Sequence, residues 1–136
     1  MSTSGYSGTP LLSKLGIKPS MKVLLVNKPK DYYDLLETDI SKQLGKKNEI
    51  PDFIHLFVKN EKEFEIEMKK LKPLIQTNKE VIIWVSWYKK SAKIPTDVTE
   101  DTVRNYALKN ELVDIKVCAV SDIWSGLKLV VPKALR

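Results

Sequence analysis

The sequence predicts an α/β fold whose sheet is mostly parallel, with helices on both faces and an antiparallel hairpin at its C-terminal end. Short apolar runs alternate along the chain with segments of helical periodicity, a pattern typical of parallel sheets built from β–α–β units. The last two apolar runs are instead separated by only five residues, 121–125, which is a hairpin length. A chain of 136 residues corresponds to one domain, so we expect residues 1–136 to fold as a single unit.

The first half of the chain predicts two helices and one buried strand. Thr9 can cap a short helix that has Pro10 at its first position and ends at Gly16. The apolar run 21–26 predicts a buried strand, and a second helix is expected after Pro29. Residues 38–52 are interpreted as the tail of that helix followed by a short edge strand near Ile50.

The second half predicts two longer helices and four strands. Asn60 and Glu63 form a capping box before a helix that we expect to end at Pro73. Thr99 is expected to cap the next helix. The predicted strands are Phe53–Val58, Val81–Trp87, Asp114–Val120 and Gly126–Val131.

Composition limits the classes of function. The chain is 43% hydrophobic and 29% charged, which is typical of a soluble globular protein. The single cysteine, Cys118, excludes an internal disulfide and a multi-cysteine metal cluster, and a reducing interior is its natural compartment. No apolar run approaches the roughly 20 residues that span a bilayer, so we expect a cytoplasmic protein that contacts no membrane.

The net charge of +6 is spread along the chain and does not form a basic block. Of the 23 basic residues, 21 are lysines, and the guanidinium fork that reads bases is nearly absent. This pattern favours a lysine-rich solvated surface over specific nucleic-acid binding.

The strand over Val81–Trp87 marks the predicted site, because ligands of open α/β sheets gather beyond the carboxyl ends of the strands. Ser86, Trp87, Lys89 and Lys90 come at or after that end, where rings offer stacking surface and lysines attract an anion. The alternative, which we favour, is that the tryptophan packs beneath helices while the lysines lie in a solvated loop.

Two further aromatic residues belong to the same candidate site. Trp124 lies in the hairpin connection, where it is either an exposed contact residue or packed back on the sheet. Tyr6 lies in a Gly/Ser-rich opening segment. Either residues 5–10 arch over the strand ends as a lid, or residues 1–8 form a flexible tail.

Two residues with reactive side chains are interpreted as parts of the core. His55 lies within an apolar strand and has no acid or nucleophile near it in sequence, so it is predicted to be a buried, hydrogen-bonded histidine. Cys118 is expected to be a buried, inert thiol.

The second half of the chain resembles the Rossmann-like methyltransferase fold. The matching features are Leu71-Lys-Pro73, the strand from Val81 to Ser86, a helix ending near Leu112, and the two final strands. The resemblance implies a three-layer Rossmann-like sheet. The first strand, however, runs into Val26-Asn-Lys-Pro-Lys-Asp31 without the glycine-rich turn that such cofactors need. S-adenosylmethionine is therefore not expected, and no catalytic residue is carried over.

A second resemblance covers nearly the whole chain and concerns a bacterial domain family of unknown function. The strings that carry it occur in order: residues 5–11 (GYSGTPL), 15–19 (LGIKP), 84–87 (WVSW) with 89–90 (KK), 96–97 (TD) with 99–101 (TED), 117–120 (VCAV) and 124–128 (WSGLK). It implies a small stand-alone protein and no particular activity.

These observations predict a non-enzymatic binding or interaction module on a shortened Rossmann-like scaffold. No nucleophile–base set, metal cluster or cofactor is predicted, and the expected partner is an anionic small molecule or a protein. The alternative is an enzyme that acts on a nucleotide-like or other anionic small molecule at the carboxyl ends of the strands, with Ser86 or Asp97 in its pocket.

Overall fold

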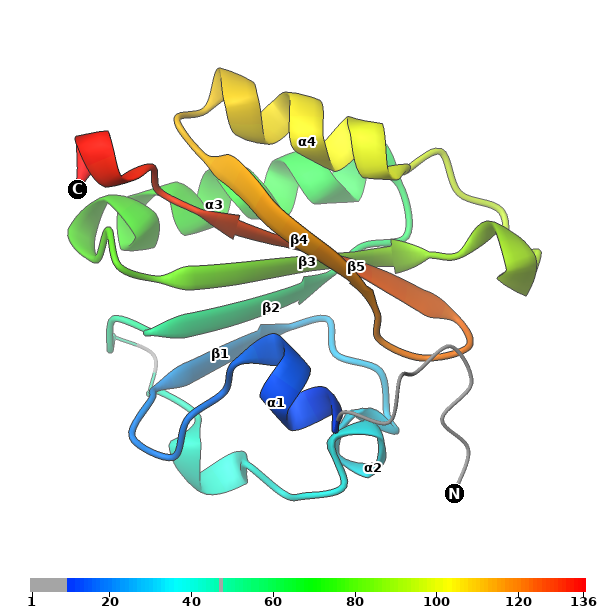
Figure 1. Cartoon of the computed structure of the whole chain (residues 1–136), viewed down its shortest axis with the longest axis horizontal. Helices are drawn as coiled ribbons and strands as arrows, with labels where there is room; N and C mark the ends of the chain where they lie inside the picture. Colours follow the sequence, from blue (N-terminus) through cyan, green and yellow to red (C-terminus); the bar gives the residue numbers. More distant parts are fainter. Residues whose placement is uncertain (1–9, 47) are drawn as a thin grey trace.

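The computed structural model describes residues 10–46 and 48–136, and it contains one five-stranded sheet covered by helices (Figure 1). The strand order across the sheet is β1-β2-β3-β5-β4. The bounds are β1 Val23–Val26, β2 Phe53–Phe57, β3 Ile82–Tyr88, β4 Val113–Ala119 and β5 Trp124–Val130.

The sheet is mixed, and this corrects the expectation that it is mostly parallel. Strands β1, β2 and β3 pair in parallel, but β5 runs antiparallel to both β3 and β4. The predicted final hairpin is therefore present, and its second strand lies inside the sheet while β4 forms the edge. The β4–β5 pairing has an irregularity between Asp114 and Lys116.

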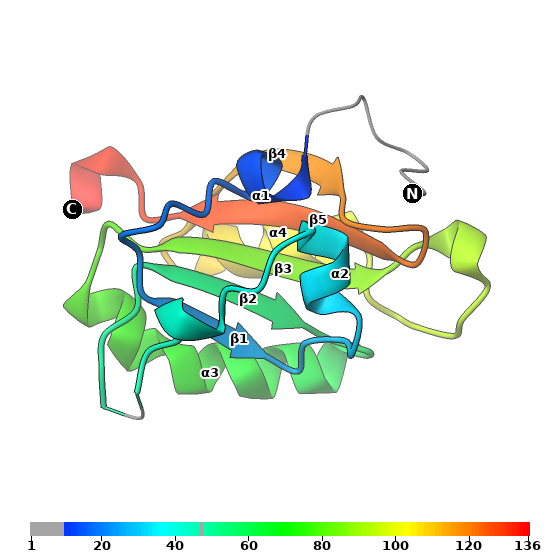
Figure 2. The same cartoon turned by 90° about the horizontal axis from the view of Figure 1, so that it is seen from below.

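Helices lie on both sides of the sheet, as the two perpendicular views show (Figures 1 and 2). Side chains of α3 and α4 form one core cluster with one face of the strands, and those of α1 and α2 form a second cluster on the other face. The bounds are α1 Leu11–Leu15, α2 Tyr32–Leu36, α3 Glu61–Thr77 and α4 Glu100–Lys109, with 3-10 turns η1 Ser41–Gln43, η2 Lys90–Ala92 and η3 Lys133–Leu135.

Alternation along the strands explains the two clusters. In β3, Ile83, Val85 and Trp87 face α3 and α4, while Trp84 faces α1. The indole Nε1 of Trp84 donates a hydrogen bond to the Leu15 carbonyl at 2.9 Å, so the polar atom of this buried ring is satisfied.

Helix starts were predicted well. Asn60 accepts a hydrogen bond from the Glu63 amide at 2.8 Å, and Thr99 forms a capping box with Thr102. The structure begins α1 after Pro10, which occupies the capping position; the predicted cap, Thr9, lies outside the described residues.

Two local predictions were wrong. Helix α3 does not end at Pro73 but continues to Thr77. Near Ile50 the structure has no strand among the described residues; the segment instead holds η1 and a single parallel bridge between Val23 and Leu44. Leu44 pairs with the outer edge of β1 through this one bridge, which does not extend into a strand.

Candidate functional site

The carboxyl ends of β1, β2 and β3 meet at one edge of the sheet because the three strands are parallel. The N-terminal end of β5 comes to the same edge, since β5 runs in the opposite direction beside β3. Residues of both β3 and the β4–β5 hairpin are therefore brought together there, which links Tyr88 to Trp124 as opposing residues of the ladder.

The turn after β1 differs from a cofactor-binding turn. Asn27 follows the strand with a left-handed φ of 58°, a conformation that asparagine tolerates better than most residues. Its side-chain amide donates a hydrogen bond to the Phe57 carbonyl at 3.3 Å, joining the ends of β1 and β2. The side chain of Asn27 thus stands where a glycine would leave the backbone open to a phosphate.

Tyr88 and Trp124 form the aromatic part of the edge. Their rings stack with centroids 4.4 Å apart, and the Trp124 ring also meets Phe57 edge-on at 5.0 Å. Trp124 is the first residue of β5, so the prediction that it lies in the hairpin connection was wrong. It is only 7% exposed and packs back on the sheet, which was one of the two predicted alternatives. Tyr88 is half-buried and is the part of the stack nearer to solvent.

Two lysines follow the stack directly. The Lys89 amide donates a hydrogen bond to the Ile123 carbonyl at 2.8 Å, so the loop after β3 is held against the hairpin. Lys89 is half-buried, and Lys90 begins η2 and is exposed. We call Tyr88, Lys89, Lys90 and Trp124 the strand-end rim.

The structure favours packing for the two remaining β3 candidates. Ser86 is fully buried on the α1–α2 side of the sheet, and Trp87 is 6% exposed within the α3–α4 cluster. Consecutive strand residues point to opposite faces, so these two side chains cannot share one pocket. The sixth candidate, Tyr6, lies outside the described residues.

Ser86 belongs to a buried polar chain with His55 and Tyr32. Nε2 of His55 lies 2.8 Å from Ser86 Oγ, and Nδ1 lies 2.8 Å from the Tyr32 hydroxyl. This confirms the prediction of a buried, hydrogen-bonded histidine. The partners were not identified from sequence because they lie 23 and 31 residues away along the chain.

Burial keeps this histidine neutral. All three side chains have no exposed surface, and burial lowers the pKa of His55 from its ordinary 6.5 to about 3. Burial likewise raises the pKa of the Tyr32 phenol. A neutral imidazole has one donor and one acceptor nitrogen, and the two hydroxyls satisfy both.

The Ser86–His55 distance suits a nucleophile and its base, but the surroundings do not admit a substrate. Gly126 faces Ser86 across the ladder, and a methyl group added there would lie 3.4 Å from Ser86 Oγ. No buried side-chain nitrogen or oxygen among the described residues lacks a hydrogen-bond partner. The chain of hydroxyl, imidazole and phenol is therefore a sealed structural network in this conformation.

The acidic candidate Asp97 is engaged in the loop after β3. Its carboxylate accepts a hydrogen bond from the Glu61 amide at 2.7 Å, at the first residue of α3. Thr96 donates to the Lys59 carbonyl at 2.8 Å. These contacts fasten the loop to the start of α3 instead of leaving Asp97 directed at a ligand.

Cys118 is half-buried, so it is less enclosed than predicted. Burial raises the pKa of its thiol, and the positive charges of Lys14, Lys116 and Lys89 oppose that effect. The raised pKa favours the neutral thiol over the thiolate.

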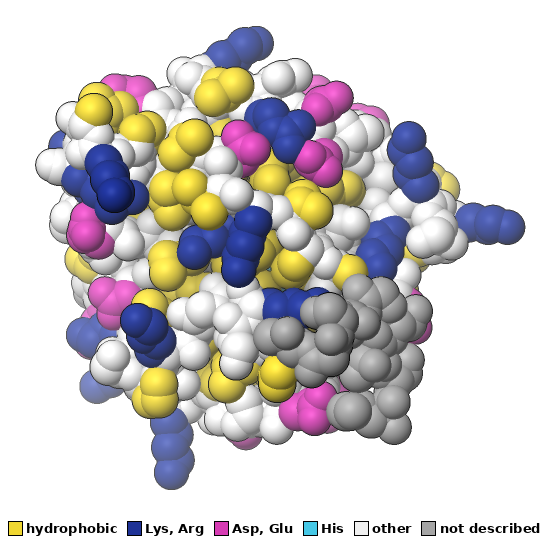
Figure 3. Space-filling model, viewed as in Figure 1, with side chains coloured by type: hydrophobic (Ala, Val, Ile, Leu, Met, Phe, Trp, Pro, Cys, Tyr) yellow, Lys and Arg dark blue, Asp and Glu magenta, His cyan; other side chains and the backbone are white. Residues whose placement is uncertain are grey.

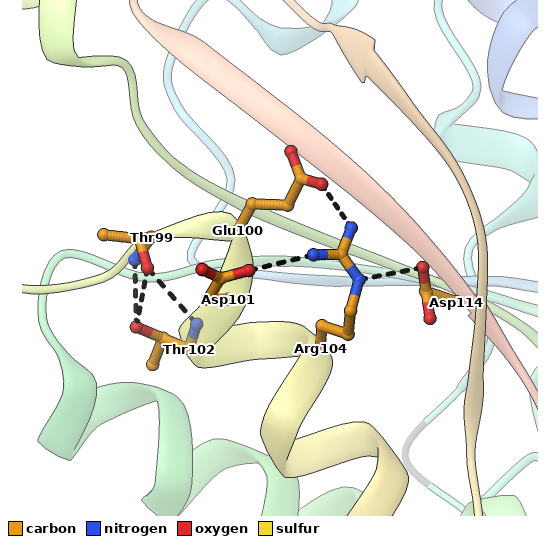
Figure 4. Close-up of polar contacts among 6 residues, drawn as sticks. All are labelled: Thr99, Glu100, Asp101, Thr102, Arg104 and Asp114. Atoms are coloured by element: carbon orange, nitrogen blue, oxygen red, sulfur yellow. Dashed lines mark hydrogen bonds and ion pairs between the residues drawn. The ribbon is translucent and has the colours of Figure 1, made fainter.

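Arg104 carries one of the two guanidinium groups of the chain, and acids surround it (Figure 4). Its Nε donates to Asp114 at 3.1 Å and its Nη1 to Asp101 at 3.0 Å, while Nη2 pairs with Glu100. These hydrogen bonds raise the pKa of the guanidinium. Arg104 therefore joins α4 to β4 and is not available to an anionic ligand.

The described residues contain neither a metal-binding cluster nor a membrane-spanning helix. Within residues 10–46 and 48–136, the acidic, histidine and cysteine side chains form no group of three or more that could hold a metal ion. Among the helices that the structure describes, none combines the length and apolarity needed to cross a membrane.

Comparison with known proteins supports the fold. No family model matches the sequence, and no curated protein shows significant similarity to it. Among solved structures, a protein in the NADB-Rossmann superfamily from Streptococcus agalactiae is similar, with a TM-score of 0.55 over 93% of this chain and 69% of that one. Sequence identity is 10%, so the likeness concerns the fold alone. The fold is Rossmann-like.

Proposed function

We propose that this Rossmann-like domain is a non-enzymatic binding module that contacts an anionic partner at the strand-end rim. The observation that carries the proposal is the stacked Tyr88–Trp124 pair followed directly by Lys89 and Lys90. A half-buried ring offers a flat apolar surface, and two adjacent ammonium groups attract a negative charge. Together they suit a ligand that has both a planar ring and a phosphate or carboxylate.

The buried network supports a binding role over the enzymatic alternative. Ser86 and His55 have the spacing of a catalytic pair but no exposed surface, and His55 is neutral because of its burial. A substrate would have to displace the packing around Trp84 and Gly126 to reach Ser86 Oγ.

The test is an NMR titration with adenosine monophosphate and with ribose 5-phosphate, which share the phosphate but differ in the ring. We expect amide shifts confined to the strand-end rim, with tighter binding of the nucleotide because its ring stacks on Tyr88. The paired reversal Lys89→Glu and Lys90→Glu should abolish both interactions. The matched reversal Lys42→Glu and Lys46→Glu changes the net charge equally at exposed sites away from the rim and should leave them unchanged.

The proposal would be overturned by an absence of shifts at the rim with either compound. Equal loss of binding in the two charge-reversed proteins would also count against it, because it would indicate a general effect of net charge. Trp87→Ala is unsuitable as a probe, since that ring lies in the α3–α4 core.

A further inference from the structure

A second site candidate lies far from the strand-end rim, in the groove between α3 and α4. The groove contains a cavity of about 200 Å³ near the C-terminal ends of both helices. Residues of α3 line one side, Tyr106 of α4 and the residues just after that helix line the other, and Leu135 of η3 also contributes. Its lining residues are Met68, Lys72, Ile75, Gln76, Lys79, Tyr106, Asn110, Glu111, Leu112, Val131 and Leu135.

The floor of this groove is apolar. Met68, Ile75, Leu112 and Val131 are each at most 8% exposed, so they belong to the core and show only a narrow apolar surface to the cavity. A ligand that covers this surface would remove it from water, which is favourable by about 25 cal/mol for each Å². The cavity is smaller than pockets for drug-sized molecules, which span roughly 300–1,000 Å³, so it suits a small ligand.

The α3 wall is basic. Lys72 and Gln76 are one helical turn apart and both line the cavity, and Lys79 lines it just beyond the end of the helix. Neither lysine forms an ion pair within the part of the chain that the structure describes. Two positive charges and an amide donor therefore lie beside an apolar floor, and neither lysine is in ion-pair contact with an acid of the described residues.

The α4 wall is polar and contains the one acid of the cavity. Burial, assisted by the charge of Glu65, raises the pKa of the Tyr106 phenol, so this group remains a hydrogen-bond donor. The Asn110 amide donates to the Tyr106 carbonyl at 2.8 Å, which closes the helix end. Glu111 follows with a left-handed φ of 61° and lines the cavity from this side.

We infer that this cavity is a binding site for a small amphipathic carboxylate, with its hydrocarbon body on the apolar floor and its anionic head toward Lys72, Gln76 and Lys79. An aliphatic carboxylate combines the two properties that the groove offers. Its head lies on the α3 wall, away from Glu111. The cavity lies at the C-terminal end of α3, where the helix dipole disfavours an anion, and the charges of Lys72 and Lys79 oppose that effect.

This site is separate from the strand-end rim, because none of the cavity's lining residues belongs to the rim. Binding in the cavity is therefore independent of binding at the strand-end rim. Binding of octanoate, the aliphatic carboxylate used as the probe below, should persist in the protein that carries both Lys89→Glu and Lys90→Glu.

The experiment is an NMR titration of the whole protein with octanoate, alongside octylamine and octanol. We expect octanoate to shift the methyl resonances of Ile75, Leu112 and Val131 with a dissociation constant on the order of millimolar. Octanol, which lacks the charge, should bind about tenfold more weakly, and octylamine more weakly still because of the lysines.

Charge variants locate the head group. The paired reversal Lys72→Glu and Lys79→Glu should weaken octanoate binding by at least about tenfold. The matched reversal Lys62→Glu and Lys69→Glu changes two exposed α3 lysines that do not line the cavity and should leave binding unchanged. Glu111→Gln should tighten binding, because it removes the acid from the opposite wall.

Three results would overturn the inference. The first is an absence of methyl shifts with octanoate in the wild-type protein. The second is equal binding of octanoate and octylamine, which would show that the lysines do not select the charge. The third is weaker binding in the Glu111→Gln protein, because a dipolar ligand would then be using that acid.

Discussion

The single histidine of this protein shows how a buried polar residue can be structural and still resemble a catalytic one. His55 has a hydroxyl at hydrogen-bond distance on each ring nitrogen, which is also the arrangement of a base and its nucleophile. The absence of exposed surface on any of the three side chains is what separates the two cases. The network instead fixes α2 to the centre of the sheet, because it joins Tyr32 to β2 and β3.

The low pKa of His55 predicts how stability depends on pH. The unfolded chain takes up a proton near pH 6.5, whereas the folded protein does so only near pH 3. The contribution of neutral His55 to the free energy of unfolding should therefore be fully present above pH 6.5. It should fall as the pH decreases below that value, with a limiting slope of about 1.4 kcal/mol per pH unit. Urea unfolding between pH 7.5 and 5, above the range in which most carboxylates titrate, measures this slope.

The ring resonances of His55 provide the decisive control. They are unambiguous because the chain has one histidine, and they should not titrate between pH 8 and 5. A titration midpoint near pH 6.5 in the folded protein would contradict the buried, neutral state.

Residue-scale features were only partly predictable. The burial of His55 follows from its apolar neighbours in β2, but its hydroxyl partners come from α2 and β3, and no local pattern specifies such a distant contact. The close packing around Gly126 could not be predicted from the sequence either. A side chain there would meet Val120 at 3.1 Å and Trp84 at 3.2 Å, and this closeness exists only after β5 has been placed beside β3.

At the scale of elements, signals that act over three or four residues were reliable. The caps at Asn60 and Thr99 were predicted because the side chain and the amide that it accepts from are close in sequence. The end of α3 was predicted wrongly, because tertiary packing overrides the local helix-breaking effect of Pro73. Leu71 and Ile75 are buried on either side of Pro73, so the helix continues through the proline to keep both in the core.

Pro73 should therefore cost stability that an alanine would restore. Proline lacks the amide that would bond one turn back in α3, and its ring opposes the helical backbone. We expect Pro73→Ala to stabilise the protein by about 1–3 kcal/mol in urea unfolding. Lys69→Ala, at an exposed position of the same helix, should change stability by less than about 0.5 kcal/mol. A destabilised Pro73→Ala protein would show that the proline is favourable where it stands.

For the whole molecule, the notable surface feature is the free edge of the sheet. Strand β4 has no partner on its outer side in the described sheet, and Ile115 and Val117 on it are about half exposed. Figure 3 shows hydrophobic side chains on this view of the molecule, with lysine, arginine and acidic side chains interspersed among them. Local disruption of the ladder between Asp114 and Lys116 is one of the devices by which proteins discourage pairing at such an edge.

The exposed edge predicts a route of aggregation. Ile115→Lys should leave the free energy of unfolding within about 0.5 kcal/mol of the wild type, because the side chain is already exposed. It should delay aggregation on heating, measured by light scattering, since a charge on an edge strand opposes intermolecular pairing. Ile66→Lys is the control, as that isoleucine is similarly exposed but lies on α3. An equal delay in both proteins would mean that aggregation does not proceed through the exposed edge of β4.

The position of β5 also determines when the sheet can form during synthesis. This strand is the last of the five to leave the ribosome, yet it separates β3 from β4 and pairs with both. Until residue 130 has emerged, β3 and β4 are both unpaired along the sides that β5 will occupy. Nascent chains that stall before this point should therefore be the ones that chaperones hold longest.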